Sequence, residues 1–328
     1  KSIEKEVVIV TSGAIALGSK DLDINIKEMK LDTSQAVSAV GQIHLMGSYK
    51  SAFEKNELKI SQILLTLDDT EQRRRSINAR RTMDTLLKMG IIPVVNENDT
   101  IATSEIRYGD NDRLAARVAQ ILSADCLILL SNINGLYSSD PNNSEKIKLI
   151  SNISEISQDI EDMAGESISE FGKGGMKTKI MAAKTAMAAG CHMAITNGTI
   201  SNPIKALFKE RPCTWFTPTK TPLAARKQWI VGTMKPIGTI LIDDGAVDAL
   251  KKGSSLLPAG IHNVIGTFSR GDAVSVESKN KDKIGIGLVG YSSDDAKKIM
   301  GHKSNEIADI LNYSYREEMI HKDDLVLL

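Results

Sequence analysis

Two clusters of carboxylate and amide side chains lie close together in the sequence and could bind a charged small molecule. The first, Asn96–Asp99, directly follows the apolar run Ile91–Val95. The second, Gly109–Asp112, precedes a segment with apolar residues at helical spacing. Asp and Asn also favour turns and helix N-termini, so either cluster alone could be loop chemistry. Together they hold more carboxylates and amides than turns and caps require, and we favour a ligand site.

The segments around these clusters predict an α/β fold that brings them to one edge of a sheet. Ile91–Val95 has the β-branched bias of a buried strand, and Cys126–Leu130 is predicted as another. With the helix expected at Arg113–Leu122 between them, they form a βαβ unit, which crosses over right-handed onto a parallel sheet. Ligands of such sheets bind outside the carboxyl ends of the strands. We therefore expect a small-molecule site at the two polar clusters.

A glycine- and lysine-rich segment, residues 171–179 (FGKGGMKTK), has the composition of a phosphate-binding loop. Its glycines let the backbone approach a ligand closely, and Lys173, Lys177 and Lys179 bring positive charge to the start of an expected helix. The spacing is not that of the Walker motif. A flexible basic surface loop is the alternative interpretation.

Two further strand ends could contribute to a site. Val7–Val10 is a predicted strand that ends in Thr11–Gly13 before a helical segment, an arrangement that can present backbone N–H groups to an anion. The strand at Cys126–Leu130 ends in Ser131 and Asn132, followed by a loop that could cover a flat ligand. Taken alone, the first feature is also explained by a helix cap and the second by a surface loop.

Length and composition indicate an ordinary globular protein with two domains. The chain has 328 residues, of which 41% are hydrophobic and 25% charged, enough for two sizeable cores. Basic and acidic residues balance at 41 each, so net charge does not favour nucleic acid or an anionic membrane as partner. Three widely spaced cysteines show no metal or disulfide pattern, and no apolar run approaches the ~18 residues of a membrane helix. We therefore expect a soluble, cytoplasmic protein.

The composition changes after Trp215, which indicates a second domain. We predict a first domain at residues 1–220, a linker at 221–228 and a second domain of short strands and turns at 229–328. From Lys227 onward there are 13 basic and 14 acidic residues, whereas an RNA-binding surface normally has a basic excess. Five arginines on the helix expected after Thr70 are interpreted as a solvated or subunit-facing surface: Arg73, Arg74, Arg75, Arg80 and Arg81.

These motifs, in this order and spacing, resemble the amino-acid kinase family, and in particular its members that phosphorylate glutamate. The matching text is VVIVTSGAIALG, VVNENDTIATSEIRYGDND, NGLYSSDP and GKGGMKTK, and the similarity extends over essentially the whole chain. The resemblance implies an amino-acid-kinase-like sandwich with a mainly parallel central sheet. Residues 229–328 resemble a PUA domain, a small β-barrel known for RNA binding.

The resemblance implies ATP-dependent phosphorylation of the γ-carboxylate of L-glutamate, the first step of proline biosynthesis, with Mg²⁺ held mainly by ATP and water. Asp112 would organise the catalytic groups, and Lys179 would stabilise charge on the transferring phosphoryl group. The residues implied in glutamate binding are Ser12, Asn96, Asp99, Asp110 and Asn111. Those implied at the nucleotide are Ser131, Asn132, Lys173, Gly174, Gly175, Met176, Lys177, Thr178 and Lys179.

The chain departs from the family pattern at two places. The family normally opens with a strand bearing a lysine and a Gly-Ser or Gly-Thr pair that contacts the phosphates, so we expect that residues are missing before Lys1. Asn132 stands where close relatives tend to have Asp, which removes a negative charge beside the nucleotide.

Two other functions stay open on the sequence alone. One is another small-molecule kinase of the same fold, although Asp99, Asp110 and Asp112 would repel an acceptor that is already phosphorylated. The other is an RNA-binding protein with an inactive kinase-like half. We favour a structural or regulatory second domain over RNA binding. The resemblance also implies a homo-oligomer, either a dimer or a tetramer, and makes proline a candidate feedback inhibitor.

Overall fold

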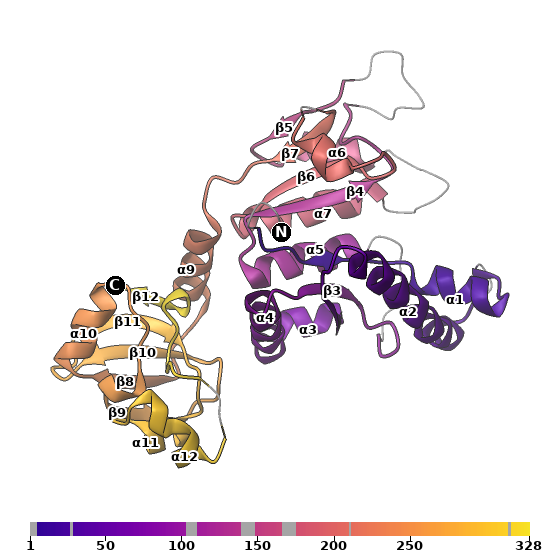
Figure 1. The fold of residues 1–328 in the computed structure, drawn as a ribbon. Helices are drawn as coiled ribbons and strands as arrows, with labels where there is room; N and C mark the ends of the chain where they lie inside the picture. Colours follow the sequence, from indigo (N-terminus) through magenta and orange to yellow (C-terminus); the bar gives the residue numbers. More distant parts are fainter. Residues whose placement is uncertain are drawn as a thin grey trace. The chain divides into compact units, whose positions relative to one another are not determined.

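The computed structural model describes residues 5–26, 29–102, 110–138, 148–165, 175–209, 211–313 and 316–328. The chain divides into two compact units, Lys1–Pro222 and Leu223–Leu328 (Figure 1). Each unit has buried hydrophobic clusters of its own.

The described strands of the first unit form two sheets with mainly parallel pairing. One contains β1 (Ile9–Val10), β3 (Ile92–Glu97) and β2 (Ile60–Leu65), in that spatial order and all parallel. The other contains β4 (Cys126–Ser131), β6 (His192–Asn197), β7 (Cys213–Phe216) and β5 (Asn152–Ile153). In this second sheet β6 and β7 run antiparallel, and the other two pairs run parallel. The predicted α/β class with a mainly parallel sheet is confirmed.

The strand pairing corrects the predicted βαβ unit. The sequence predicts β3 and β4 in one parallel sheet, but among the described residues they belong to different sheets. Helix α5 (Asp110–Leu122), which connects them, packs against strands of both sheets. β3 is also longer than the apolar run that predicted it, because the backbones of Asn96 and Glu97 continue the ladder opposite β2.

The other helices of the first unit mostly agree with the sequence pattern. They are α1 (Ala14–Leu22), α2 (Leu31–Glu54), α3 (Leu67–Glu71), α4 (Arg73–Lys88), α6 (Gln158–Gly165), α7 (Gly175–Ala188) and α8 (Pro203–Leu207). The helix expected after Thr70 is α4, which is separate from the short α3 because Gln72 between them is extended (φ −73°, ψ 109°). The segment before α6 forms β5, in which Ile153 is buried and pairs with β7.

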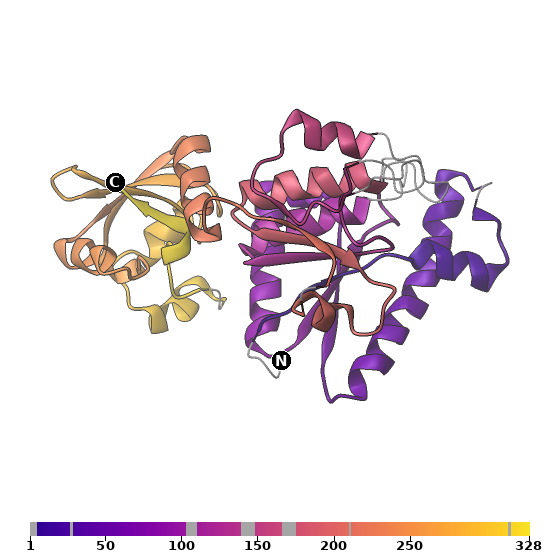
Figure 2. The same ribbon diagram turned by 90° about the horizontal axis from the view of Figure 1, so that it is seen from above.

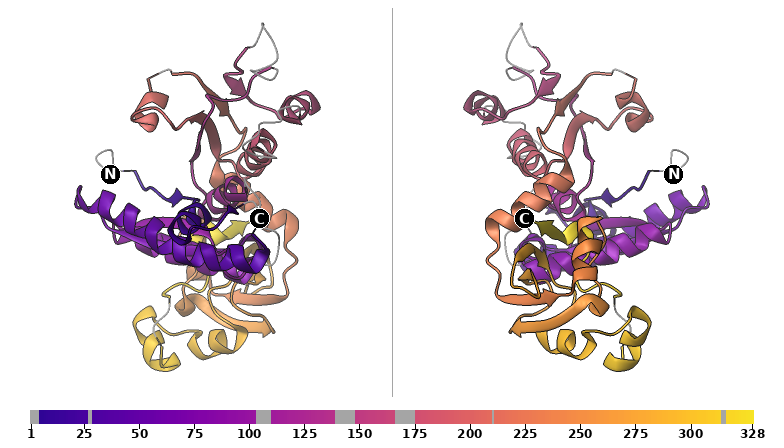
Figure 3. Two further views of the ribbon diagram at one scale, coloured as in Figure 1. Left: turned by 90° about the vertical axis from the view of Figure 1, so that its right-hand side faces the viewer. Right: turned by 90° about the vertical axis from the view of Figure 1, so that its left-hand side faces the viewer.

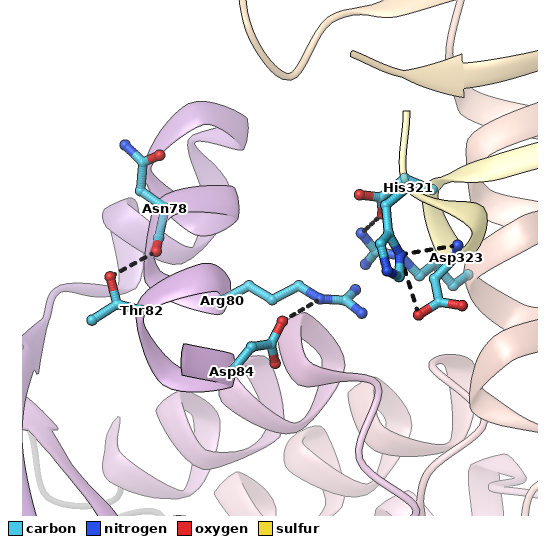
Figure 4. A network of polar contacts seen from close by, with 8 residues as sticks. Asn78, Arg80, Thr82, Asp84, His321 and Asp323 are labelled. Carbon is cyan, nitrogen blue, oxygen red and sulfur yellow. Dashed lines mark hydrogen bonds and ion pairs between the residues drawn. The ribbon is translucent and has the colours of Figure 1, made fainter. Parts of the chain in front are cut away.

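The arginine-rich helix α4 forms local ion pairs. Arg75 contacts Asp69 (2.7 Å), and the Arg80 Nε donates to Asp84 (3.4 Å; Figure 4). Both carboxylates belong to α3 and α4 themselves. The Arg75 side chain is 60% exposed, as expected for a solvated surface, whereas that of Arg80 is only 16% exposed.

Helices α1 and α2 lie side by side with their backbones in close contact (Figures 1 and 3). A Cβ atom on Gly18 would overlap the carbonyl oxygen of Val37, and one on Gly41 would overlap that of Ala14. At the start of α1, Gly13 has φ 106°, which side-chain-bearing residues rarely adopt. These three glycines therefore hold α2 beside the end of β1, where the polar clusters lie.

The second unit is built on a five-stranded mixed sheet. Its strands, in spatial order, are β12 (Leu325–Leu327), β11 (Lys283–Leu288), β10 (Ala273–Ser278), β8 (Gly238–Ile242) and β9 (Ile261–Gly266). In the described part of the chain β9 and β12 are the two edge strands of this sheet and do not pair with each other. The core is covered by side chains of α10 (Asp244–Lys251), α11 (Ser293–Ile299) and α12 (Ile307–Leu311) rather than by closure of the sheet.

The predicted linker 221–228 is helical in the structure. It forms most of α9 (Pro222–Thr233), whose Ala225 and Ile230 are buried. Arg226 on this helix pairs with Asp324 (2.5 Å), and near that carboxylate His321 contacts Asp323 (3.5 Å; Figure 4).

None of the helices in the described ranges has the length and apolar character that crossing a bilayer would require.

The close packing of α1 and α2 gives a stability prediction. Gly41→Ala should destabilise the protein by about 1–3 kcal/mol, because the new methyl group meets backbone that cannot move aside alone. The control is Gly47→Ala on the same helix, where a Cβ atom meets nothing within 4 Å. That change should stabilise by about 0.5–1 kcal/mol through helix propensity. Urea unfolding of both variants checks this, and equal midpoints would refute the close contact.

Candidate functional site

A chain of hydrogen bonds joins the ends of β1 and β3 to helices α5 and α2. Asn111, in the first turn of α5, donates through Nδ2 to the backbone carbonyl of Thr11 (2.5 Å) and to Oδ1 of Asn96 (3.0 Å). Asn96 in turn donates to Oε1 of Gln42 on α2 (2.8 Å). The two predicted polar clusters therefore meet, and they do so beside Ser12 at the carboxyl ends of β1 and β3.

Asp99 is a buried carboxylate that follows β3 and is 7% exposed. The Ser38 hydroxyl donates to its Oδ2 (2.6 Å). Burial raises the pKa of the Asp99 carboxyl, and the hydrogen bond from Ser38 offsets only part of this effect. Ionised Asp99 is thus costly to bury, and a bound cation such as an amine would stabilise it.

One face of helix α2 provides polar contacts that the sequence analysis missed. Gln35 donates to the carbonyl of Ala102 (2.9 Å), Ser38 bonds to Asp99 and Gln42 accepts from Asn96. Farther along the same helix, the Tyr49 hydroxyl donates to Thr11 Oγ1 (3.0 Å). The signal in the sequence was the helical spacing of Gln35, Ser38, Gln42 and Tyr49, which places polar side chains on one face. That spacing alone does not show whether the polar face lines a binding site or is exposed to solvent.

An ion pair connects the start of α5 with the start of α7. Lys179 Nζ donates to Oδ2 of Asp112 (2.8 Å), and the Thr178 hydroxyl donates to the same oxygen (3.2 Å). The two charged side chains are 15% and 20% exposed. Asp112 and Lys179, which the resemblance implies in catalysis, therefore lie in direct contact, together with Thr178, which it implies at the nucleotide.

Alanines bring α5 and α7 close enough for this contact. The two helices lie side by side (Figures 1 and 2). Small side chains of both helices share one buried cluster: Ala115, Ala116 and Ala119 on α5, and Ala182, Ala183 and Ala186 on α7. Bulkier residues would separate the helices and break the contact between Asp112 and Lys179.

The helix ends make this region attractive to anions. Asp112 complements the positive end of the α5 dipole. Lys179 lies near the positive end of α7, an unfavourable position for a cation that the Asp112 carboxylate offsets. A phosphate group could take the place of that carboxylate beside the lysine and the first N–H groups of the helix.

The predicted nucleotide residues of β4 lie at the carboxyl edge of the second sheet. Ser131 is buried and its hydroxyl donates to Oδ1 of Asn132 (3.3 Å), while its carbonyl accepts from the N–H of Gly198 after β6 (2.7 Å). The loop that follows is fixed by Thr214, whose hydroxyl accepts from the N–H of Leu136 (2.8 Å).

The remaining predicted residues are placed as follows. Gly175 and Met176 begin α7, which starts earlier than the sequence indicates because Met176 is buried in the core. Lys177 is exposed on the first turn of this helix. Lys173 and Gly174 lie outside the described residues, as does the side chain of Asp110.

Comparisons with known proteins agree with this fold. The model of the amino acid kinase family matches residues 1–197, and that of the PUA domain matches residues 238–311. The chain therefore belongs to the amino acid kinase family and carries a C-terminal PUA domain.

Within this family, the chain is similar over its whole length to proteins named glutamate 5-kinase. That of Pelagibacter ubique is 55% identical over 322 residues, which are 98% of this chain and 88% of that protein. The proteins of Paramagnetospirillum magneticum and Rhizobium johnstonii are each 51% identical, over 100% and 98% of this chain and 88% and 83% of their own lengths. At this identity and coverage the chain belongs to the glutamate 5-kinases.

The buried carboxyl of Asp99 gives a prediction about pH and stability. The pKa of the Asp99 carboxyl is raised in the folded protein. The stability contributed by its protonated form is therefore fully present below the pKa of the unfolded chain, about 3.9, and is lost as the pH rises through the pKa of the folded protein. Asp99→Asn removes this loss, so it should stabilise the unliganded protein at pH 7 more than at pH 4. Urea unfolding at both pH values measures the difference.

Asp69 offers the opposite case as a control. Burial tends to raise its pKa, but hydrogen bonds from Thr66 and Arg75 outweigh this effect and leave the pKa lowered. Asp69 therefore contributes stability above its unfolded pKa, and Asp69→Asn should destabilise at pH 7. If both substitutions changed the free energy of unfolding in the same direction at pH 7, this would contradict the view that burial destabilises the Asp99 carboxylate.

Proposed function

We infer that the protein transfers the γ-phosphoryl group of ATP to the γ-carboxylate of L-glutamate, the first step of proline biosynthesis. The similarity to glutamate 5-kinases across the whole chain supports this reaction. The observation that carries it is the contact of Lys179 with Asp112, beside the amide chain that starts at Asn111. This arrangement puts a cation for phosphoryl oxygens next to polar groups suited to an amino acid.

On the substrate side, we assign the ammonium group of glutamate to Asp99. A buried carboxylate with a raised pKa gains most from a cationic partner, which compensates its lost hydration. The α-carboxylate fits the donors at the start of α1 and α5, near Ser12 and Asn111. Asn96 accepts a hydrogen bond from Asn111 and is assigned to the same substrate. Asp110, first in α5, is assigned to the same substrate from the sequence.

On the nucleotide side, we assign the phosphates to the N-terminal end of α7. None of the described residues lies within 4 Å of where a Cβ atom of Gly175 would be, so they leave its backbone open to a ligand. Lys177, Thr178 and Lys179 add donors and charge at this end. Lys173 and Gly174 precede it and are assigned to the same loop, with Met176 as its anchor in the core. Ser131 and Asn132 are assigned to the nucleotide at the edge of β4.

The chemistry needs positioning and charge neutralisation more than proton transfer. A γ-carboxylate is already a nucleophile, so no general base is required. One of its oxygens bonds to the γ-phosphorus while the bond to the bridging oxygen breaks and ADP leaves. Lys179, held by Asp112 before ATP binds, is placed to donate to the phosphoryl oxygens as their charge shifts in the transition state.

Mg²⁺ fits this site as a partner of the nucleotide. The described residues contain no group of three or more His, Cys, Asp or Glu that could hold a metal ion by itself. The ion would therefore be coordinated mainly by ATP oxygens and water, and it would neutralise charge on the β- and γ-phosphates.

We propose the cytoplasm as the location and a homo-oligomer as the working form. Proline is a candidate inhibitor, since it shares the amine and α-carboxylate that the site would recognise. For the second unit we propose a structural or regulatory role. RNA binding is not favoured by its nearly balanced charge. An inactive kinase-like half is the competing function, and a direct assay separates the two.

The assay is phosphoryl transfer with ATP, Mg²⁺ and L-glutamate in the presence of hydroxylamine, which traps an acyl phosphate as hydroxamate. We expect hydroxamate that depends on glutamate, with ADP formed in equal amount. ADP release without hydroxamate would show that glutamate is not the acceptor. Absence of both would support the competing function.

Lysine substitutions on α7 connect this activity to the site. Lys179→Met should lower kcat by about 10²–10³-fold, because a positioned donor to the transition state is lost. The control is Lys184→Met on the same helix, because the ammonium group of Lys184 pairs with Glu161 (2.5 Å). This substitution should leave kcat within about twofold of the unsubstituted protein. Similar kcat values for both variants would remove Lys179 from the mechanism.

A further inference from the structure

Among the described residues, the hydrogen-bond chain at the site ends in a donor that has no partner. Thr11 contributes a backbone carbonyl, which can only accept, so the amide of Asn111 must donate to it. The same NH₂ group donates to Asn96, which obliges Asn96 to donate to Gln42. Gln42 therefore accepts with Oε1, and its Nε2 is left at the end of the chain. This nitrogen is buried and has no hydrogen-bond partner in the described part of the structure.

An amide N–H buried without an acceptor loses its bonds to water and reduces stability. Buried polar groups are rarely left in this state, and such a group needs an explanation. The contact with Asn96 accounts for the side-chain oxygen of Gln42, since Asn96 donates to Oε1, but it does not account for Nε2. The unpartnered nitrogen is explained if a ligand supplies the acceptor.

The position of Gln42 indicates which ligand group this is. It lies one helical turn after Ser38, the residue that holds Asp99. An amino-acid substrate whose ammonium group lies at Asp99 has only carboxylate oxygens as strong acceptors. A carboxylate oxygen is therefore the group of matching chemistry within reach of this face of α2.

We propose that Gln42 binds a carboxylate of the amino-acid substrate through its Nε2. The proposal rests on the inferred phosphorylation of glutamate and adds a residue of α2 to the substrate site. It also gives the polar chain a function, since Asn111 and Asn96 fix the direction in which the Gln42 amide donates. Gln42 is thereby held in its binding orientation before the substrate arrives.

Two substitutions separate this role from support of Asn96. Gln42→Glu keeps an acceptor for Asn96 but loses the donor, whereas Gln42→Met loses both and adds no charge. Both should raise the KM for glutamate by about tenfold or more, since a hydrogen bond to a charged group is lost, while the KM for ATP stays within about twofold. A parallel fall in kcat identifies the γ-carboxylate as the bound group, and an unchanged kcat identifies the α-carboxylate.

Matched controls and a binding measurement complete the test. Gln62 is an exposed glutamine on β2, and Gln62→Glu and Gln62→Met should leave both KM values unchanged. The rise in melting temperature caused by glutamate should be reduced in the Gln42 variants and kept in the Gln62 variants. Lowering the pH should bring the KM of Gln42→Glu for glutamate closer to that of the unsubstituted protein, because a protonated carboxyl group can donate a hydrogen bond.

The outcomes are distinct. A normal KM for glutamate in Gln42→Glu, whatever Gln42→Met does, would show that Gln42 only supports Asn96 and would overturn the proposal. If the unsubstituted protein forms no hydroxamate and glutamate does not raise its melting temperature, the proposed function fails, and this inference fails with it. If the unsubstituted protein is active and the Gln42 variants have a normal KM for glutamate, the proposed function stands and only the inference about Gln42 is overturned.

Discussion

The contact between Lys179 and Asp112 is the interaction on which the rest of the site depends. It places a cation near the positive end of a helix, where only a neighbouring carboxylate or a bound anion makes the position favourable. The alanine-rich interface of α5 and α7 makes the contact possible, and the same turn of α5 carries Asn111 into the amide chain. One helix thus connects the proposed phosphate side of the site with the proposed amino-acid side.

Much of this site could be predicted from local sequence patterns. The apolar run before Asn96 and the polar residues after it located a strand end, and the glycines before Lys179 located a helix start. These signals are local because strand ends and helix starts are set by neighbouring residues. The resemblance to a known family supplied the roles, which stay predictions, and the structure brings Asn111 into contact with Asn96 and Lys179 into contact with Asp112.

The parts that could not be predicted depend on contacts between distant segments. Gln35, Ser38 and Gln42 have the spacing of any helix face, and only the packing of α2 against α1 makes that face a wall of the site. The division of the strands into two sheets follows from pairing partners, which an apolar run does not specify. The predicted linker is part of helix α9, and the burial of Ala225 and Ile230 on that helix is not specified by the local sequence.

The central claim is that Asp112 acts by holding Lys179 for the transferring phosphoryl group. A double-mutant cycle on kcat with Asp112→Asn and Lys179→Met tests it most directly. If the two residues act as one unit, the double variant should be about as slow as the slower single variant, because the second change removes nothing further. Effects on kcat that multiply, as for independent groups, would contradict the account.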